Sequence, residues 1–98
     1  MLQTLADAIQ HKRVLEFVYD GCQRIVEPHA VGYSSEGNLL LRCYQVEGQS
    51  RHSPIPDWRL MTVAKIQNLT VVPNRHFTSP RDGYRRGDSA MATIYAQL

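Results

Sequence analysis

The chain has 98 residues, of which 43% are hydrophobic and 20% are charged. These values are typical of one small globular domain, and they exclude a chain that is disordered throughout. The net charge of +2 is well below the strongly basic balance expected of a protein that binds DNA unaided. No stretch approaches the roughly 18 apolar residues of a transmembrane helix, and residues 1–13 lack the apolar core of a signal peptide, so we expect a cytoplasmic protein.

The first predicted element is a short helix that ends near His11. Thr4 and Asp7 have the spacing of a capping box, which predicts that the helix begins at Thr4. Apolar residues recur three and four positions apart, as on one face of a helix. These residues are Leu2, Leu5, Ala6 and Ile9.

Five short strands are expected next, because apolar and polar residues alternate between turn signals. They cover residues 13–19, 24–31, 38–46, 58–63 and 69–72. Asp20-Gly21 predicts a tight hairpin, since both residues tolerate positive φ. Pro28 lacks the N–H that a sheet ladder uses, so the second strand should lie at a sheet edge or bend there. Residues 51–57 contain two prolines and are expected to form a loop.

The pattern changes again after the fifth strand, where Pro73 is expected to end the sheet and an irregular, basic crossing to begin. Asp88 is a suitable N-cap for a C-terminal helix. Four apolar residues would then share one face of that helix, and we expect them to be buried against the sheet or a second chain. They are Met91, Ile94, Tyr95 and Leu98.

The expected fold is therefore mainly β, a small antiparallel barrel or sandwich with a helix at each end. One domain covers residues 1–98, with the N-terminal helix and barrel in residues 1–77 and the basic crossing and C-terminal helix in residues 78–98. The alternation of the strands predicts several core residues. These are Phe17, Leu39, Leu41, Val63 and Val71.

Few residues have the spacing of a catalytic or metal site. The four histidines, His11, His29, His52 and His76, and the two cysteines, Cys22 and Cys43, match no metal motif, and the thiols are expected to be free and buried. Glu27 and His29 lie two apart on one strand, so the carboxylate could orient the imidazole as a general base, or the two could form a structural polar pair. No nucleophile accompanies them. We expect no enzyme activity, no cofactor and no metal.

Basic residues suggest two surfaces. The first is a short stretch with one acid, Asp82, and it is either a solvated loop or a functional segment: Arg75, His76, Arg81, Arg85 and Arg86. The second is a set of arginines and aromatics spread over several strands, which either scatter or converge on one cationic and aromatic surface. Its members are Arg24, Arg42, Arg51 and Arg59 with Tyr19, Tyr44 and Trp58.

Short motifs also occur in a fixed order along the chain. They are Ala8-Ile9, residues 13–21, Arg24, residues 26–29, the Gly37 turn, residues 39–41, Tyr44 and Lys65-Ile66. In this order they resemble the WYL-domain family of bacterial proteins, over roughly residues 2–77. The likeness is incomplete, because residues 39–41 are Leu-Leu-Leu where the family has Trp-Tyr-Leu, and Lys65 stands where the family often has arginine. The chain is similar to a stand-alone, WYL-like branch of that family.

The resemblance implies an SH3/Sm-like β-barrel that senses a ligand and regulates transcription or phage defence. The matching polar positions, which would bind that ligand, are Tyr19, Arg24, His29, Arg42 and Lys65, and strand spacing adds Arg59. We therefore expect a regulatory module that binds a nucleotide or single-stranded nucleic acid, with no membrane partner. The alternatives are a protein-interaction or assembly domain without such a ligand, which would pair with itself or with another protein, and a small hydrolase that uses Glu27 and His29.

Overall fold

The structure, a computed structural model, describes residues 1–51 and 53–98. His52, which belongs to the histidines and the loop considered above, lies outside the described residues. Within the described part there are one α-helix, one 3-10 turn and six strands. These are α1 (Leu2–Gln10), β1 (Arg13–Tyr19), β2 (Cys22–Tyr33), β3 (Leu39–Gly48), β4 (Asp57–Thr62), η1 (Val63–Lys65), β5 (Gln67–His76) and β6 (Thr93–Gln97). The prediction of a mainly β fold with an N-terminal helix is confirmed.

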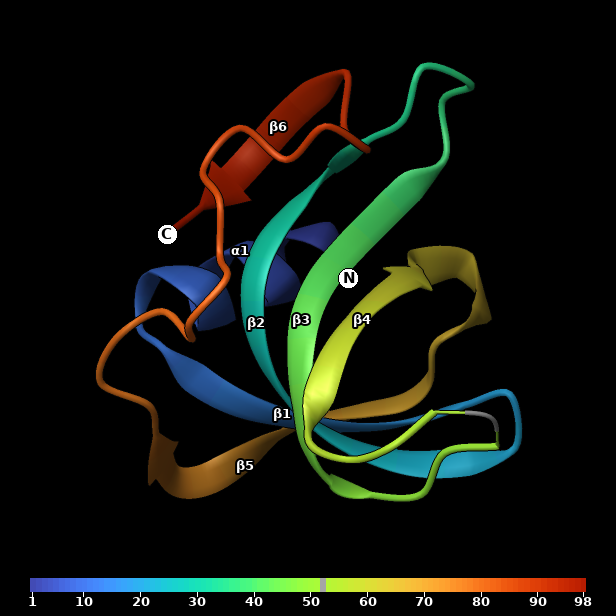
Figure 1. The fold of residues 1–98 in the computed structure, drawn as a ribbon, viewed down its shortest axis with the longest axis vertical. Helices are drawn as coiled ribbons and strands as arrows, with labels where there is room; N and C mark the ends of the chain where they lie inside the picture. The colour runs from blue at the N-terminus through green and yellow to red at the C-terminus, as the bar shows by residue number, and fades with distance from the viewer. Residues whose placement is uncertain (52) are drawn as a thin grey trace.

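The strands form one antiparallel sheet in the order β4-β3-β2-β1-β5, and β6 pairs with β2. The long β2 strand makes both contacts, because residues 22–26 pair with β1 and residues 30–33 pair with β6. Figure 1 shows that the sheet curves, so that β1 and β5 cross one end of the molecule while β2, β3 and β4 rise from it. Among the described residues no ladder joins β4 to β5, and the sheet is therefore open.

The turns and prolines test the predicted strand ends. Asp20 and Gly21 have φ values of 53° and 72°, so the predicted hairpin is confirmed. β2 is an interior strand, and it bends near Pro28: Pro28 pairs with Cys43 and Ala30 with Arg42, which leaves His29 as the extra residue of a β-bulge. On the other side of β2 the ladder with β1 ends at Val26 and the ladder with β6 begins at Ala30, so Pro28 lies in the gap between them.

Pro73 does not end the sheet, contrary to prediction, and β5 continues to His76. β5 is the last strand of the main sheet, and an edge strand tolerates a proline because its outward groups need no ladder partner.

The predicted C-terminal helix is wrong, because residues 93–97 form strand β6. β1 leaves the edge of β2 unpaired beyond Val26, and β6 fills that edge from Ala30 to Tyr33. A helix of about ten residues is marginal in water, so a strand with ready ladder partners is the more stable choice. Burial is also only partly as predicted: Met91 is buried, but Tyr95 is 52% exposed.

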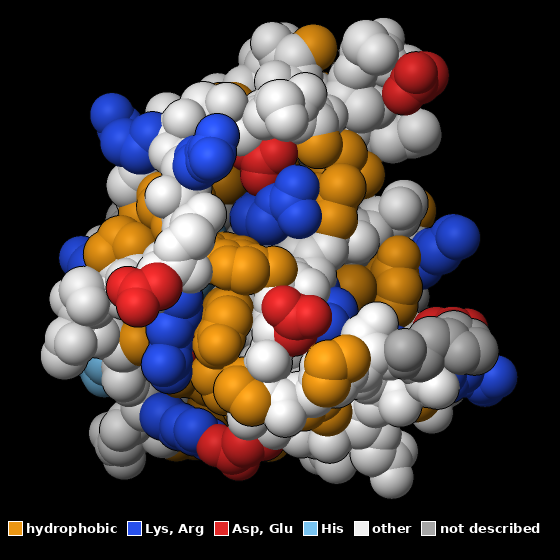
Figure 2. All heavy atoms as spheres, in the orientation of Figure 1, with side chains coloured by type: hydrophobic (Ala, Val, Ile, Leu, Met, Phe, Trp, Pro, Cys, Tyr) orange, Lys and Arg blue, Asp and Glu red, His pale blue; other side chains and the backbone are white. Residues whose placement is uncertain are grey.

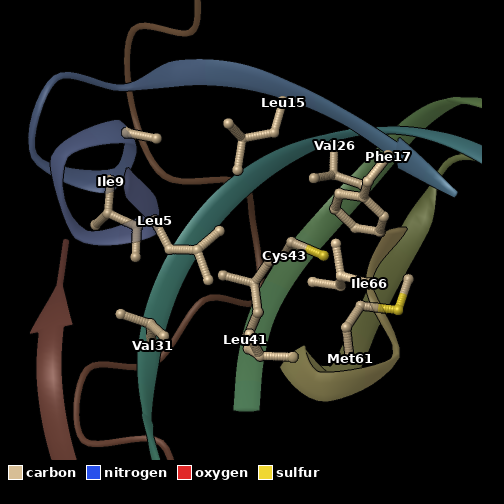
Figure 3. Packing of buried hydrophobic residues seen from close by; sticks show 12 residues of the cluster. Leu5, Ile9, Leu15, Phe17, Val26, Val31, Leu41, Cys43, Met61 and Ile66 are labelled. Carbon is tan, nitrogen blue, oxygen red and sulfur yellow. The ribbon is translucent and has the colours of Figure 1, made fainter. Parts of the chain in front are cut away.

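The core lies on the concave side of the sheet, where α1 packs (Figure 3). Phe17, Leu41 and Val63 are buried as predicted, whereas Leu39 and Val71 are partly buried at its margin. Leu5 and Ile9 of α1 are fully buried beside them.

The start of α1 differs from the prediction. The helix begins at Leu2 without a side-chain cap, and Asp7 accepts a hydrogen bond from Gln3 in place of capping-box contacts with Thr4. Apolar burial, not the cap, therefore fixes this helix. Within the described residues, no helix combines the length and the apolar character needed to span a membrane.

Candidate functional site

Residues 77–92, which we call the strap, link β5 to β6 and pack on the convex side of the sheet. Figure 1 shows this segment in orange, running from the end of β5 towards β6. The strap covers the His29 bulge, and three aromatic rings surround the imidazole. The ring centroids of Trp58, Phe77 and Tyr84 lie 4.8, 5.4 and 5.1 Å from that of His29. The bulge thus turns a strand residue into the centre of an aromatic cluster.

The hydrogen bonds of His29 define its protonation state. Its Nε2 atom accepts from the backbone N–H of Arg81 at 3.1 Å, and its Nδ1 atom lies 2.8 Å from the carbonyl oxygen of Glu27. Only a neutral imidazole with the proton on Nδ1 satisfies both partners. The ring is fully buried, and burial lowers the pKa of His29 from its ordinary value of 6.5. His29 is therefore an anchor for the strap.

Two ion pairs fasten the strap on either side of this cluster. Arg81 binds the carboxylate of Glu27 through Nε at 2.7 Å and Nη2 at 2.9 Å, and its guanidinium lies over the ring of Tyr44. Arg42 binds Asp88 through Nε at 2.6 Å and Nη2 at 3.3 Å. The hydrogen bonds from Arg42 lower the pKa of Asp88, so its carboxylate is charged at neutral pH.

These contacts distinguish between the two roles considered for Glu27 and His29, a general base oriented by a carboxylate and a structural polar pair. The Glu27 carboxylate pairs with Arg81, and His29 bonds to the backbone of Glu27 and not to its carboxylate, so the carboxylate does not orient the imidazole. Both ring nitrogens are occupied and buried. A general base needs a nitrogen within reach of a substrate proton, and His29 offers none. The arrangement therefore supports a structural role for Glu27 and His29 over a catalytic one.

The Arg42 side of the strap holds a hollow of about 440 Å³, which we call the arginine hollow. Its aromatic and charged lining consists of Arg42, Trp58, Tyr84, Arg85, Arg86 and Asp88. Trp58 and Tyr84 stack with centroids 6.2 Å apart and planes at 25°. Figure 2 shows this face, on which basic side chains border exposed hydrophobic ones.

The arginines of the arginine hollow differ in how many hydrogen-bond partners they already have in the protein. Three arginines face one aspartate, which gives the lining a net charge of +2. Arg86 donates through Nε to the backbone oxygen of Leu98 at 2.8 Å. Arg85 is exposed, and its guanidinium enters no hydrogen bond or ion pair between the described residues.

A second hollow, of about 530 Å³, lies on the Arg81 side of the strap, and we call it the neutral hollow. Asp82 lines this hollow and the next residue, Gly83, lines the arginine hollow. Its charged lining residues are Arg75, Arg81, Glu27 and Asp82, which cancel. Arg75 also pairs with Glu47, and Arg81 is held by Glu27. Among the described residues, both arginines that line the neutral hollow therefore have a carboxylate partner.

The six predicted ligand residues do not form one site. Tyr19, Arg24 and Arg59 meet on the concave side, where Arg24 Nη1 and Arg59 Nε each donate to Oε1 of Gln45 at 3.2 Å. Arg24 also donates to the carbonyl of Tyr19, and its guanidinium lies 5.7 Å from that ring centroid. These contacts anchor the loop after β3, since Gln45 donates to the carbonyl of Gln49.

The other three predicted residues lie elsewhere. Arg42 lies between the buried Leu41 and Cys43 of β3, so it faces the opposite side of the sheet from Arg24 and Arg59. The prediction that Arg24, Arg42 and Arg59 share one surface is therefore wrong. His29 and Arg42 are on the side of the sheet that the strap covers, which we call the strap face. Lys65 is exposed at the end of η1.

The two cysteines are free and buried, as predicted. Burial raises the pKa of Cys43 to about 12, so its thiol is not available as a nucleophile or metal ligand. The part of the chain that the structure describes contains no group of three or more potential metal-ligating side chains.

The sequence did not predict that Tyr84, Arg85 and Arg86 lie together with Trp58: Arg85 and Arg86 were assigned to the basic stretch, and Trp58 to the arginines and aromatics of the strands, which could scatter or converge. The available signal was the pair of arginines between Gly83 and Gly87. Both glycines have positive φ, 91° and 74°, as a tightly turning loop requires. Comparison of the chain with protein-family models, with curated proteins and with solved structures found no match.

Proposed function

We propose that this protein is a regulatory binding module whose ligand is anionic and contains an aromatic ring, as a nucleotide or a single-stranded nucleic acid does. The ligand would occupy the arginine hollow. The observation that carries this proposal is the stacked Trp58–Tyr84 pair beside Arg85, an exposed cation without a partner among the described residues.

The composition of the hollow suits that ligand. Aromatic rings stack on nucleobases, and arginine guanidinium groups bind phosphate oxygens through paired hydrogen bonds. The volume of about 440 Å³ lies within the range of small-molecule sites. Arg42, the one of the six predicted ligand residues that lines the hollow, is 27% exposed and retains donors that Asp88 does not use.

We also propose that the fold is an SH3/Sm-like relative of the WYL-domain barrel. Support comes from the helix followed by five consecutive antiparallel strands in one curved sheet, with β4 and β5 at its two ends. Binding without catalysis follows from the same proposal, because Glu27 and His29 serve the strap.

Trp58 gives a direct test, because it is the sole tryptophan in the sequence and lines the hollow. Its fluorescence, excited at a wavelength that nucleotides do not absorb, should change on titration with mononucleotides and short oligonucleotides at low salt. Arg85→Ala should weaken binding by about 1–3 kcal/mol, the loss of a charge-assisted contact. Lys65→Ala is the matched control, because it removes an exposed cation that does not line the hollow. Unchanged fluorescence up to high micromolar ligand would refute the proposal.

One observation favours the assembly alternative. β4 and β6 each have one strand edge that no described strand covers, and they carry Leu60 and Tyr95, which are 40% and 52% exposed. Open edges can pair with a second copy. Sedimentation that gives a dimer mass, abolished by Leu60→Lys or Tyr95→Lys, would favour assembly over ligand binding.

A further inference from the structure

The charges on the strap face are unevenly distributed, and this difference bears on the kind of ligand. The arginine hollow has a net charge of +2, and the Arg85 guanidinium forms no hydrogen bond or ion pair with a described residue. The neutral hollow has as many acids as arginines. Figure 2 shows acidic and basic side chains side by side on this face.

In the neutral hollow each arginine already has a carboxylate partner. Arg81 binds Glu27 with both oxygens engaged, and Arg75 pairs with Glu47. A second phosphate placed there would have to compete with these carboxylates and approach the exposed Asp82. A single strand needs a continuous positive groove along its backbone, and on the other side of Gly83 both arginines, Arg75 and Arg81, are already paired with carboxylates.

From this distribution, and resting on the proposed function, we infer that the ligand is one mononucleotide with its charge concentrated in a terminal phosphate group, not a strand. A phosphate monoester carries about −1.5 to −2 charges at neutral pH, which matches the +2 of the arginine hollow. Arg85 and Arg86 bind the phosphate, and the base lies against Trp58 and Tyr84. The neutral hollow stays outside the site.

Two serines on the strap provide a matched pair of variants. Ser89 lines the arginine hollow and Ser79 the neutral hollow. Both are exposed, and neither side chain forms a hydrogen bond with a described residue, so Ser89→Glu and Ser79→Glu add the same negative charge and remove no hydrogen bond. Circular dichroism of both variants verifies that the fold is retained.

The experiment measures the affinity of adenosine, adenosine 5′-monophosphate and a deoxyadenylate decamer for the wild type and both variants at pH 7. We expect the monophosphate to bind about 10-fold or more tighter than adenosine, as one charge-assisted contact gives. The decamer should bind no tighter than the monophosphate, once its number of equivalent positions is allowed for. Ser89→Glu should remove the advantage of the phosphate, and Ser79→Glu should leave it.

Three results would overturn the inference. The first is equal affinity for adenosine and its monophosphate. The second is a decamer that binds far tighter than the monophosphate and is weakened by Ser79→Glu, which means that a strand crosses both hollows. The proposed function survives this second result, whereas equal affinity for adenosine and its monophosphate would also contradict the anionic ligand of the proposed function. Absence of binding by all three compounds would instead remove the proposed function itself.

Discussion

The imidazole of His29 and the backbone N–H of Arg81 form a hydrogen bond of 3.1 Å that ties the bulge of β2 to the strap. The acceptor is a ring nitrogen without a proton, so the bond exists only while His29 is neutral. The charged groups next to the ring are Glu27 and Arg81, which pair with each other. Burial dominates, and it lowers the pKa of the folded histidine.

The first prediction concerns pH. Unfolded His29 takes up a proton near pH 6.5, whereas the folded residue does so only at lower pH. Its contribution to the free energy of unfolding is therefore complete above pH 6.5 and declines as the pH falls towards the folded pKa. Urea unfolding of wild type and His29→Gln between pH 8 and pH 5 should show the wild-type advantage shrinking in acid. A constant difference would contradict this role.

The second prediction concerns the Arg42–Asp88 pair. The Asp88 side chain is 8% exposed, so Asp88→Asn should destabilise the protein by about 1.5–3 kcal/mol, the range for hydrogen bonds to charged groups. Asp82→Asn is the control, because the Asp82 carboxylate is exposed on the same strap, and its effect should stay within about 0.5 kcal/mol. The pKa of folded Asp88 is lowered from 3.8, so the wild-type advantage should persist above pH 3.8 and decline below it. Equal stability of the two variants at pH 7 would be evidence against the pair.

The third prediction tests the core. Leu41 is fully buried, and Leu41→Ala should reduce the free energy of unfolding by about 2–5 kcal/mol. Leu60, on the neighbouring strand, is 40% exposed, and the same substitution there should cost much less. Denaturant titrations that give equal losses would mean that the concave side is not the core.

The fourth prediction concerns the docking of β6 on β2. A Cβ atom at Gly32 would overlap the carbonyl oxygen of Thr93 and lie 2.9 Å from the Cα of Ile94. Gly32→Ala should therefore displace β6, with backbone amides in residues 93–97 exchanging faster while those of β1 and β3 stay protected. Unchanged exchange in β6 would show that this strand does not lie against Gly32.

Local patterns predicted much of the fold. Alternation placed Phe17 and Leu41 in the core, and Asp20-Gly21 formed the predicted hairpin, because each depends on neighbouring residues alone. The spacing of Ile94 and Leu98 suited a helix as well as a strand. What decided between them was the unpaired edge of β2, which comes from a distant part of the chain.

The candidate site was harder to predict for the same reason. Arg42 and Arg59 occupy similar sequence contexts, but one residue of register sends them to opposite sides of the sheet. The contacts of the strap join residues about 50 apart, as in His29 with Arg81 and Arg42 with Asp88. Charge and glycine content marked the strap as unusual, but its partners lay in other strands.

The central claim is that the arginine hollow binds the ligand, and chemical-shift mapping tests it most directly. Adenosine 5′-monophosphate added to ¹⁵N-labelled protein should shift the indole N–H of Trp58 and the backbone amides of residues 84–89, in proportion to occupancy. Amides near Tyr19 and Lys65 should stay in place, because neither residue lines the hollow. Shifts confined to the region of Tyr19, Arg24 and Arg59, or a spectrum unchanged at millimolar ligand, would contradict the account.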